Sequence, residues 1–172
     1  VSPYATAYRY GGGILRNAAP HVGKPRVLKL DIRHFFESIL YSTVKGTAFP
    51  AEIYEEKLRI LLAMLCYDRD RLPQGAPTSP CITNLILRDF DDEVGAWCRA
   101  RQIAYTRYCD DMTFSGGFRR EEVIRFVEPR LRARGFFLHT GKTKWLPAGR
   151  RQTVTGLVVN QALNVPADER RG

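Results

Sequence analysis

The stretch from Tyr105 to Ser115 constrains this chain most, because two adjacent carboxylates, Asp110 and Asp111, lie inside apolar, strand-forming sequence. The β-branched and aromatic residues on both sides predict a strand, a tight turn and a second strand, with the two acids at the turn. Two negative charges ~4 Å apart repel each other by ~4 kcal/mol at an effective dielectric constant of 20. The pair is therefore unfavourable unless a cation joins it. The simpler interpretation is that aspartate favours turns, and the choice depends on whether other residues converge on the pair.

The composition is that of a globular protein with a basic surface. The chain has 172 residues, 44% of them hydrophobic and 26% charged, enough for one domain with a substantial core. Lys and Arg number 27 against 18 acids, for a net charge of +9. This excess indicates an anionic partner, most often nucleic acid, although a merely soluble basic protein is the alternative. No apolar run is long enough to span a membrane and no signal peptide is visible, so we expect a cytoplasmic location and no membrane partner.

Basic residues gather toward both ends of the chain. They are Arg9, Arg16, Lys24, Arg26 and Lys29 in the first thirty residues, and Lys142, Lys144, Arg150 and Arg151 near the other end. With the acids in between, this distribution suits a phosphate-lined channel with metals at its middle. Among the first group lie three tyrosines, Tyr4, Tyr8 and Tyr10. They indicate either a surface that faces nucleic acid or a packed irregular segment. The four cysteines are widely spaced without a Cys-x-x-Cys, which predicts neither a zinc site nor disulfides.

Hydrophobic periodicity predicts alternating helices and strands with one loop of special shape. Residues 26–32 form an apolar strand that delivers Asp31 at its end, and the loop from Arg71 to Pro80 is rich in Pro and Gly and therefore pre-shaped. Further elements are predicted as follows: helices over 51–65, with its apolar face in the core, 79–99 and 119–134, and strands over 136–139 and 153–160, the last interrupted by Gly156.

This order of elements predicts an α+β domain, an antiparallel sheet covered by helices on one face. In such a sheet Asp31 and the Asp110-Asp111 hairpin could come from neighbouring strands, and three carboxylates would then converge. Ligation by oxygen alone, without His or Cys, favours Mg²⁺. Magnesium held by carboxylates and completed by substrate phosphates is the two-metal arrangement for phosphoryl transfer.

The same residues carry a family resemblance. Asp31 with Phe35-Phe36, the loop from Leu72 to Pro80, and Tyr108-Cys-Asp-Asp111 resemble, in order, the motifs of reverse transcriptases. Asn17-Ala-Ala-Pro-His21 and Val154-Thr-Gly156 resemble the Asn-Ala-x-x-His and Val-Thr-Gly elements of bacterial retron reverse transcriptases. Group II intron-like and other bacterial relatives are the alternative within the family.

The resemblance implies a polymerase palm with partial fingers and a thumb that is largely absent. It assigns the single domain, residues 1–172, as follows: about 1–25 and 40–78 to the fingers, 26–39 and 79–160 to the palm, and 161–172 to the start of a linker toward the thumb. Arg9 or Arg16 is expected to help grip the triphosphate, as basic fingers residues do.

The resemblance also implies a catalytic role for three acids. Asp31 and Asp110 would hold two Mg²⁺ ions, with Asp110 contacting both, and Asp111 would complete or tune the cluster. The backbone carbonyl of Ile32 is an additional metal ligand in this interpretation.

Further residues are expected to bind the substrates. Phe36 matches the steric gate that excludes a ribose 2′-hydroxyl, while Phe35 is expected in the core; a core position for Phe36 is the alternative. Gln74 and Gly75 would line the incoming nucleotide, and Lys142 would approach the pyrophosphate, unless it is only a surface lysine. Residues expected to contact or support the primer or template are Tyr108, Asn17, His21, Thr155 and Gly156.

The function that this resemblance implies is RNA-directed DNA polymerisation in antiphage defence. The expected partners are a structured RNA that serves as template and primer, the nascent DNA, deoxynucleoside triphosphates and an effector protein. Two alternatives remain open at this point. One is a non-catalytic, polymerase-like scaffold that binds RNA or an effector, and the other is template-independent nucleotide addition in phage defence.

Overall fold

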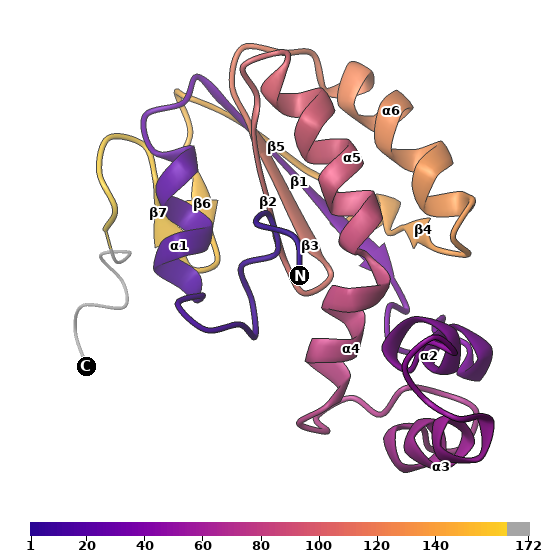
Figure 1. Ribbon diagram of the computed structural model, residues 1–172. Helices are drawn as coiled ribbons and strands as arrows, with labels where there is room; N and C mark the ends of the chain where they lie inside the picture. The colour runs from indigo at the N-terminus through magenta and orange to yellow at the C-terminus, as the bar shows by residue number, and fades with distance from the viewer. Residues whose placement is uncertain (165–172) are drawn as a thin grey trace.

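The computed structural model of the chain describes residues 1–164, so the end of the predicted 161–172 linker lies outside the described residues. Helices alternate with strands along the chain (Figure 1). The helices are α1 (Ile14–Ala18), α2 (Tyr41–Ala48), α3 (Glu56–Cys66), α4 (Ser79–Ile86), α5 (Arg88–Arg99) and α6 (Arg120–Arg132), with 3-10 turns at Ala19–His21 and Thr140–Lys142. The strands are β1 (Arg26–Arg33), β2 (Ala104–Tyr108), β3 (Asp111–Ser115), β4 (Phe137–Leu138), β5 (Lys144–Pro147), β6 (Thr153–Val154) and β7 (Leu157–Val158).

Strand β1 is the centre of a five-stranded antiparallel sheet. It pairs with β3 on one side, and with β5 and β4 at its two ends on the other side, while β2 pairs with the outer edge of β3. In the β1–β3 register Asp31 lies opposite Asp111. The predicted α+β class and the neighbouring positions of Asp31 and the hairpin are therefore confirmed.

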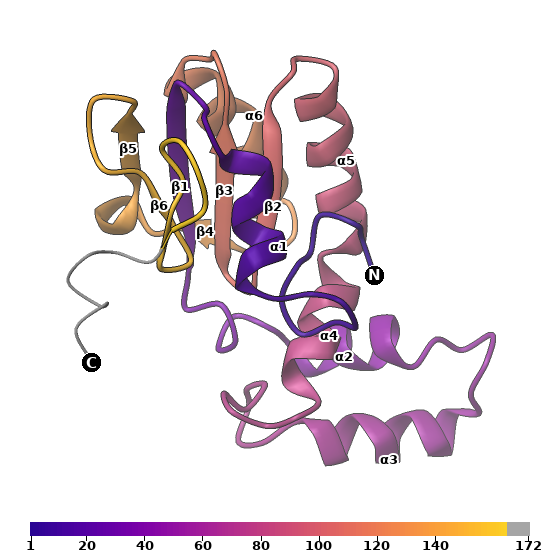
Figure 2. The ribbon, with the colours of Figure 1, turned by 90° about the vertical axis from the view of Figure 1, so that its left-hand side faces the viewer.

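The two faces of the sheet have different coverings. Leu28, Leu30 and Ile32 point to the face that carries α5 and α6, and with them form the main core (Figure 1). The opposite face is covered at one end by α1 and the β6–β7 hairpin, over a small apolar cluster that includes Val27 (Figure 2). The prediction of helices on one face was therefore incomplete, and the rest of the opposite face is the part that carries Asp31 and Asp111.

A buried ion pair fastens the β2–β3 hairpin to the helices. The guanidinium of Arg107 on β2 donates to both carboxylate oxygens of Asp91 on α5, at 2.6–3.1 Å, and neither side chain has exposed surface. Arg107 also donates to the side-chain oxygen of Asn84 on α4, and the Tyr105 hydroxyl donates to Asp91. Burial alone would lower the pKa of Arg107, but the contact with Asp91 outweighs it and raises the pKa, so the pair stays charged.

A buried histidine anchors the start of the chain to the sheet. Both ring nitrogens of His21 share hydrogen bonds with hydroxyls of the sheet, Nδ1 with Ser115 at 2.6 Å and Nε2 with Thr106 at 2.8 Å. Burial, and secondarily the charge of Lys24, lower the pKa of His21 to about 3. His21 is therefore neutral at physiological pH.

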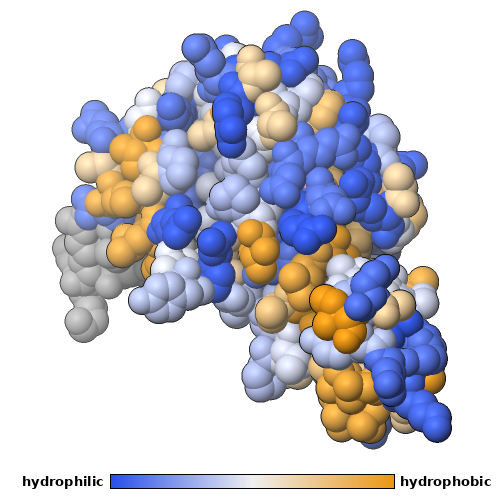
Figure 3. Space-filling view, viewed as in Figure 1, coloured by the Kyte–Doolittle hydropathy of each residue, from blue (hydrophilic) through white to orange (hydrophobic). Residues whose placement is uncertain are grey.

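The predicted helix over 51–65 differs from the structure in its start and in its surroundings. Helix α3 begins only at Glu56, and its apolar side chains are exposed: Leu61 to 54%, Met64 to 63% and Leu65 to 74%. They form an apolar patch on the projecting α2–α3 region (Figure 3). The expected core position is wrong because the helix packs on α2 and buries only Ala63 fully, so amphipathicity here does not coincide with burial.

Two further predicted elements are each divided in the structure. The helix expected over 79–99 is interrupted at Leu87 and becomes α4 and α5. The strand expected over 153–160 is the β6–β7 hairpin, because Thr155 and Gly156 take φ of 45° and 83° and reverse the chain. Within residues 1–164, no helix is long and apolar enough to cross a membrane.

The ion pair predicts the stability of one variant. Arg107→Met should lower the free energy of unfolding by about 3–5 kcal/mol, because it leaves the Asp91 carboxylate buried without a partner. Urea unfolding measures this change. Arg88→Met, which breaks the exposed Arg88–Asp89 pair, is the control and should cost less than about 1 kcal/mol. Equal costs in the two variants would contradict a dominant role for the buried pair.

The pKa of His21 predicts a pH dependence. Below pH 6.5 the unfolded chain binds a proton at His21 that the folded chain excludes until about pH 3, so folding stability falls as the pH falls through this window. Each pH unit costs about 1.4 kcal/mol. Between pH 6.5 and 5, wild type should therefore lose about 2 kcal/mol more than His21→Gln in urea unfolding. Parallel pH profiles for the two proteins would exclude a buried neutral histidine.

Candidate active site

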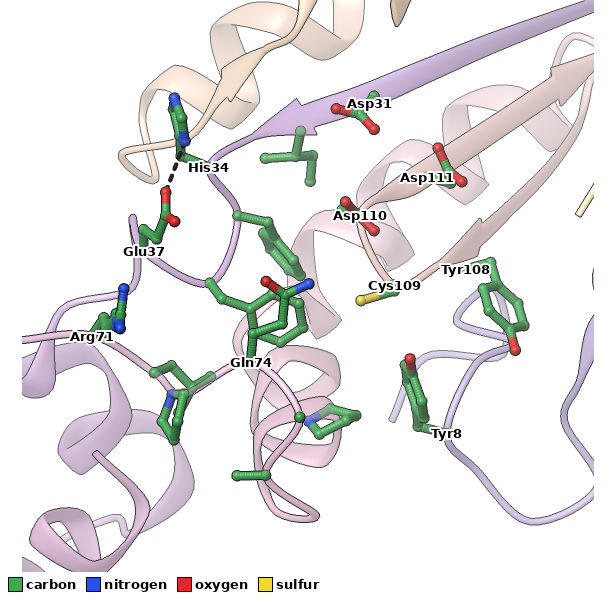
Figure 4. A pocket seen from close by; sticks show the side chains of 18 of the residues that line it. Tyr8, Asp31, His34, Glu37, Arg71, Gln74, Tyr108, Cys109, Asp110 and Asp111 are labelled. Carbon is green, nitrogen blue, oxygen red and sulfur yellow. Dashed lines mark ion pairs between the residues drawn. The ribbon is translucent and has the colours of Figure 1, made fainter. Parts of the chain in front are cut away.

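Three carboxylates come together at one end of the sheet. Asp31 lies near the end of β1 and is 7% exposed, Asp111 is the first residue of β3, and Asp110 lies in the turn before it (Figure 4). Burial, followed by repulsion from Asp110 and Asp31, raises the pKa of Asp111. Lys29 and Lys142 oppose this rise. The cluster therefore carries negative charge that the protein neutralises only in part.

The turn that carries Asp110 is held from behind. Tyr108 pairs with Asp111, so Cys109 and Asp110 form a two-residue loop, and Cys109 takes a left-handed φ of 59°. Such a conformation is unfavourable for a residue other than glycine. Arg107 Nη1 donates to the Cys109 carbonyl at 2.7 Å, which ties the turn to the buried ion pair.

The backbone of Ile32 also meets this turn. The Ile32 amide donates to the Asp110 carbonyl at 3.1 Å. Because the N–H and C=O of a strand residue point to the same side, the Ile32 carbonyl faces the hairpin too. The Ile32 carbonyl as a metal ligand stays a prediction of the resemblance.

A lysine contacts the acid cluster directly. Lys142 Nζ lies 3.2 Å from Asp31 Oδ2, and this hydrogen bond raises the pKa of Lys142. In residues 1–164, no three carboxylate, histidine or cysteine side chains are arranged so that they enclose a metal ion. The donor chemistry nevertheless fits a hard cation, since the cluster offers only oxygen atoms and one of its acids already binds an ammonium group.

The acids open into a cavity of about 1110 Å³. Its other wall is the loop before α4, which contains Gln74 and Gly75 (Figure 4). Gly75 has φ of 95°, which the third position of a type II turn requires and which glycine adopts without strain. The Ser79 hydroxyl donates to the Pro73 carbonyl at 2.6 Å and fixes the loop to the first turn of the helix.

The two phenylalanines after β1 divide as expected from the sequence. Phe35 is buried in the main core, where its ring lies 5.5 Å from that of Phe136. Phe36 is half-buried and lines the cavity. Adjacent residues in a tight turn cannot face the same side, so burial of Phe35 leaves Phe36 at the site.

Most of the predicted site residues line this cavity, and four do not. Those that line it are Asp31, Ile32, Phe36, Gln74, Gly75, Tyr108, Asp110, Asp111 and Lys142. Of the other four, Asn17, Thr155 and Gly156 lie where α1 meets the β6–β7 hairpin, and His21 lies in the 3-10 turn after α1, against β2 and β3. Asn17 Nδ2 donates to Thr155 Oγ1 at 3.4 Å, so the two short flanking motifs contact each other. Asn17 and His21 are buried, which gives them a supporting position rather than an exposed surface for primer or template.

The cavity also contains Arg71, which the sequence did not single out, and Tyr8, one of the three tyrosines expected on a nucleic-acid-facing surface or in a packed segment. Arg71 and Tyr8 line it, whereas Arg9 and Arg16 do not, because they donate to backbone carbonyls of their own segment. The expectation that Arg9 or Arg16 grips the triphosphate is therefore not supported by their positions. Arg71 immediately precedes the Leu72–Pro80 motif, and this position was the sequence feature that could have indicated that Arg71 lines the cavity.

A family model matches nearly the whole chain. Residues 1–159 match the model described as "Reverse transcriptase (RNA-dependent DNA polymerase)". Among solved structures, apo telomerase from Candida tropicalis, truncated from the C-terminal domain, matches with a TM-score of 0.63 and 12% identity, over 88% of this chain and 37% of that one. Telomerase from Candida albicans in complex with a TWJ fragment of telomeric RNA matches with a TM-score of 0.62 and 11% identity, over 94% and 36%. At these identities the likeness shows the fold alone, a polymerase palm.

Curated relatives are more similar in sequence. The chain is 35% identical to the retron Mx65 reverse transcriptase of Myxococcus xanthus, over 99% of this chain and 44% of the relative. It is 32% identical to the retron Ec86 reverse transcriptase of Escherichia coli, over 93% and 50%. The chain thus spans about half the length of the curated relatives it matches. With the family model covering nearly all of its length, this chain belongs to the reverse transcriptase family and, within it, to the retron type.

Proposed function

We propose that this chain carries the polymerising site of an RNA-directed DNA polymerase, which adds deoxynucleotides to a primer on an RNA template. The observation that carries the proposal is the register of β1 and β3, which sets Asp31 opposite Asp111 beside Asp110, across a cavity from the Gln74–Gly75 loop. Asp31 and Asp111 stand on paired strands, and carboxylates on strands are held more rigidly than carboxylates on loops, as a phosphoryl-transfer site requires.

Reverse transcriptases generally use divalent metal ions. Two Mg²⁺ ions are proposed here, held by Asp31 and Asp110, with Asp111 and the Ile32 carbonyl in support. When bound, the ions supply a lowered pKa for the primer hydroxyl and charge neutralisation for the departing pyrophosphate. The strand register itself brings the carboxyl groups together, and such a cluster favours cations over other ligands at this end of the sheet.

Residues around the acids are proposed to bind and select the nucleotide. Gln74 and Gly75 would contact the incoming nucleotide and the template base. Phe36 would exclude a ribose 2′-hydroxyl by steric clash. Lys142, already beside Asp31, would carry its positive charge or its proton toward the pyrophosphate. Arg71 is a second cation on the cavity wall for the triphosphate.

Lysines on the open sheet face support binding of nucleic acid. Lys29 lies two residues before Asp31 and therefore on the same face, and Lys144 is its cross-strand partner. The phosphates of a primer strand that extends from the acid cluster along this face would contact these two positive charges. The proposed partners are a structured RNA, recognised by its shape and 2′-hydroxyls, the nascent DNA and an effector protein, in bacterial antiphage defence. The fingers and palm boundaries and a cytoplasmic location stay predictions.

Replacement of one acid tests the polymerase. With an RNA template, a DNA primer, deoxynucleotides and Mg²⁺, we expect template-directed extension by wild type and a loss of roughly 10³-fold or more in Asp110→Asn, because several kcal/mol of charge stabilisation disappear. Primer extension on sequencing gels measures both. Asp89→Asn, an exposed acid on α5, is the matched control and should extend as wild type does.

The outcomes separate this proposal from its alternatives. Undiminished extension by Asp110→Asn would overturn the site. Binding of RNA without extension by wild type would favour a scaffold. Products whose sequence ignores the template would favour template-independent addition.

Replacement of Phe36 tests selection of the sugar. In Phe36→Ala the preference for deoxynucleotides over ribonucleotides, as a ratio of kcat/KM values, should fall by about 10- to 100-fold, because the ring no longer blocks the 2′-hydroxyl. Phe137→Ala, an exposed aromatic outside the cavity, is the control and should keep the preference. An unchanged preference in Phe36→Ala would remove the steric-gate assignment.

A further inference from the structure

Three tyrosines at the start of the chain have three different environments. Tyr4 is packed: its ring lies 5.6 Å from that of Tyr105, and a Cβ at Gly95 of α5 would collide with it. Tyr10 is fully exposed and lies outside the cavity. Tyr8 alone lines the cavity, and 57% of it is exposed. A ring that served only to fill the core would be buried, so Tyr8 calls for another explanation.

The backbone of Tyr8 is held in an unfavourable conformation by buried contacts. Its φ is 52°, in the left-handed region that residues other than glycine seldom adopt. Directly before it, the Ala7 carbonyl accepts from Asn84 Nδ2 at 2.9 Å, and Asn84 is in turn bound by Arg107. Strain that the surroundings impose in this way is concentrated at functional sites.

The orientation of Tyr8 points to an aromatic surface beside the acids. Its ring lies 6.2 Å from that of Tyr108, at an interplanar angle of 42°, so the rings do not stack fully on each other. Both lie next to the Cys109–Asp110 turn, on the side of the cavity away from Gln74 (Figure 4). Since Tyr8 is 57% exposed and lines the cavity, much of its ring is open beside the acids, where the proposed function would place the end of the primer.

We propose that Tyr8 stacks on a nucleobase of the terminal primer–template base pair and, with Tyr108, forms an aromatic platform at the polymerising site. The inference rests on the proposed function and adds a contact that neither the motifs nor the acids assign. Planar, uncharged nucleobases match an exposed ring of this kind, and stacking is tolerant of base identity. The surrounding backbone holds the ring in place before substrate binds, which lowers the entropy cost of the contact.

The test is binding of a fluorescent hybrid in the presence of EDTA, where chemistry cannot occur. An RNA–DNA hybrid carries 2-aminopurine either at the primer 3′ end or at the template base opposite, and fluorescence reports stacking on each. Wild type should quench one of the two positions. Tyr8→Ala should lose this quenching and bind about 5- to 150-fold more weakly.

Three further variants make the result specific. Tyr8→Phe keeps the ring and should behave as wild type, whereas Tyr8→Leu keeps apolar bulk without a π-face and should resemble Tyr8→Ala. Tyr10→Ala, the matched control, should change neither signal. If Tyr8→Ala quenches and binds as wild type does, the stacking inference is overturned. Extension by wild type would in that case still support the polymerase. If wild type neither binds nor extends the hybrid, both the stacking inference and the proposed function are overturned.

Discussion

Arg107 carries a full positive charge into the interior of the domain, and four of its five donors reach the helices and the hairpin turn that support the site. Two contact Asp91 on α5, one contacts Asn84 on α4, and one contacts the carbonyl of Cys109 in the hairpin turn. A planar guanidinium can satisfy several acceptors at fixed angles, which a lysine could not do. The acids at the front of the sheet therefore depend on an ion pair behind it.

This arrangement links two residues of unfavourable backbone geometry. Cys109 and Tyr8 come from distant parts of the sequence, both have left-handed φ, and both border the cavity. Arg107 holds the first directly and the second through Asn84 and the Ala7 carbonyl. A single buried network thus stabilises both, and the packing of α4 and α5 is transmitted to the site through it.

The sequence predicted the elements whose pattern is local. The apolar run ending in Asp31 and the hairpin with Asp110-Asp111 have strong periodicity, and the division between Phe35 and Phe36 follows from their adjacency. The burial of Arg107 could not be predicted, because a charged residue alternating with apolar ones indicates the solvent face. Its partner Asp91 lies within a helix whose other acids, such as Asp89, are exposed.

Other differences between prediction and structure arose where the burial or position of a segment depends on what packs against it. Helix α3 was correctly predicted to be amphipathic, but its hydrophobic periodicity does not indicate which element, if any, packs against its apolar side. The turn at Thr155-Gly156 was missed because a β-branched residue seldom takes positive φ. The backbone position of Tyr8 depends on the hydrogen bond from Asn84 to the carbonyl of the preceding Ala7, a long-range contact that no sequence pattern indicates.

The central position of β1 also has a consequence for biosynthesis. This strand leaves the ribosome well before its pairing partners β3 and β5, which begin only at Asp111 and Lys144. At about 5–20 residues per second, the apolar strand waits for seconds with both edges unpaired. Such an edge is a template for intermolecular pairing. The charges of Lys29 and Asp31 within it would oppose aggregation during that interval, so the residues proposed to bind substrate also protect the nascent chain.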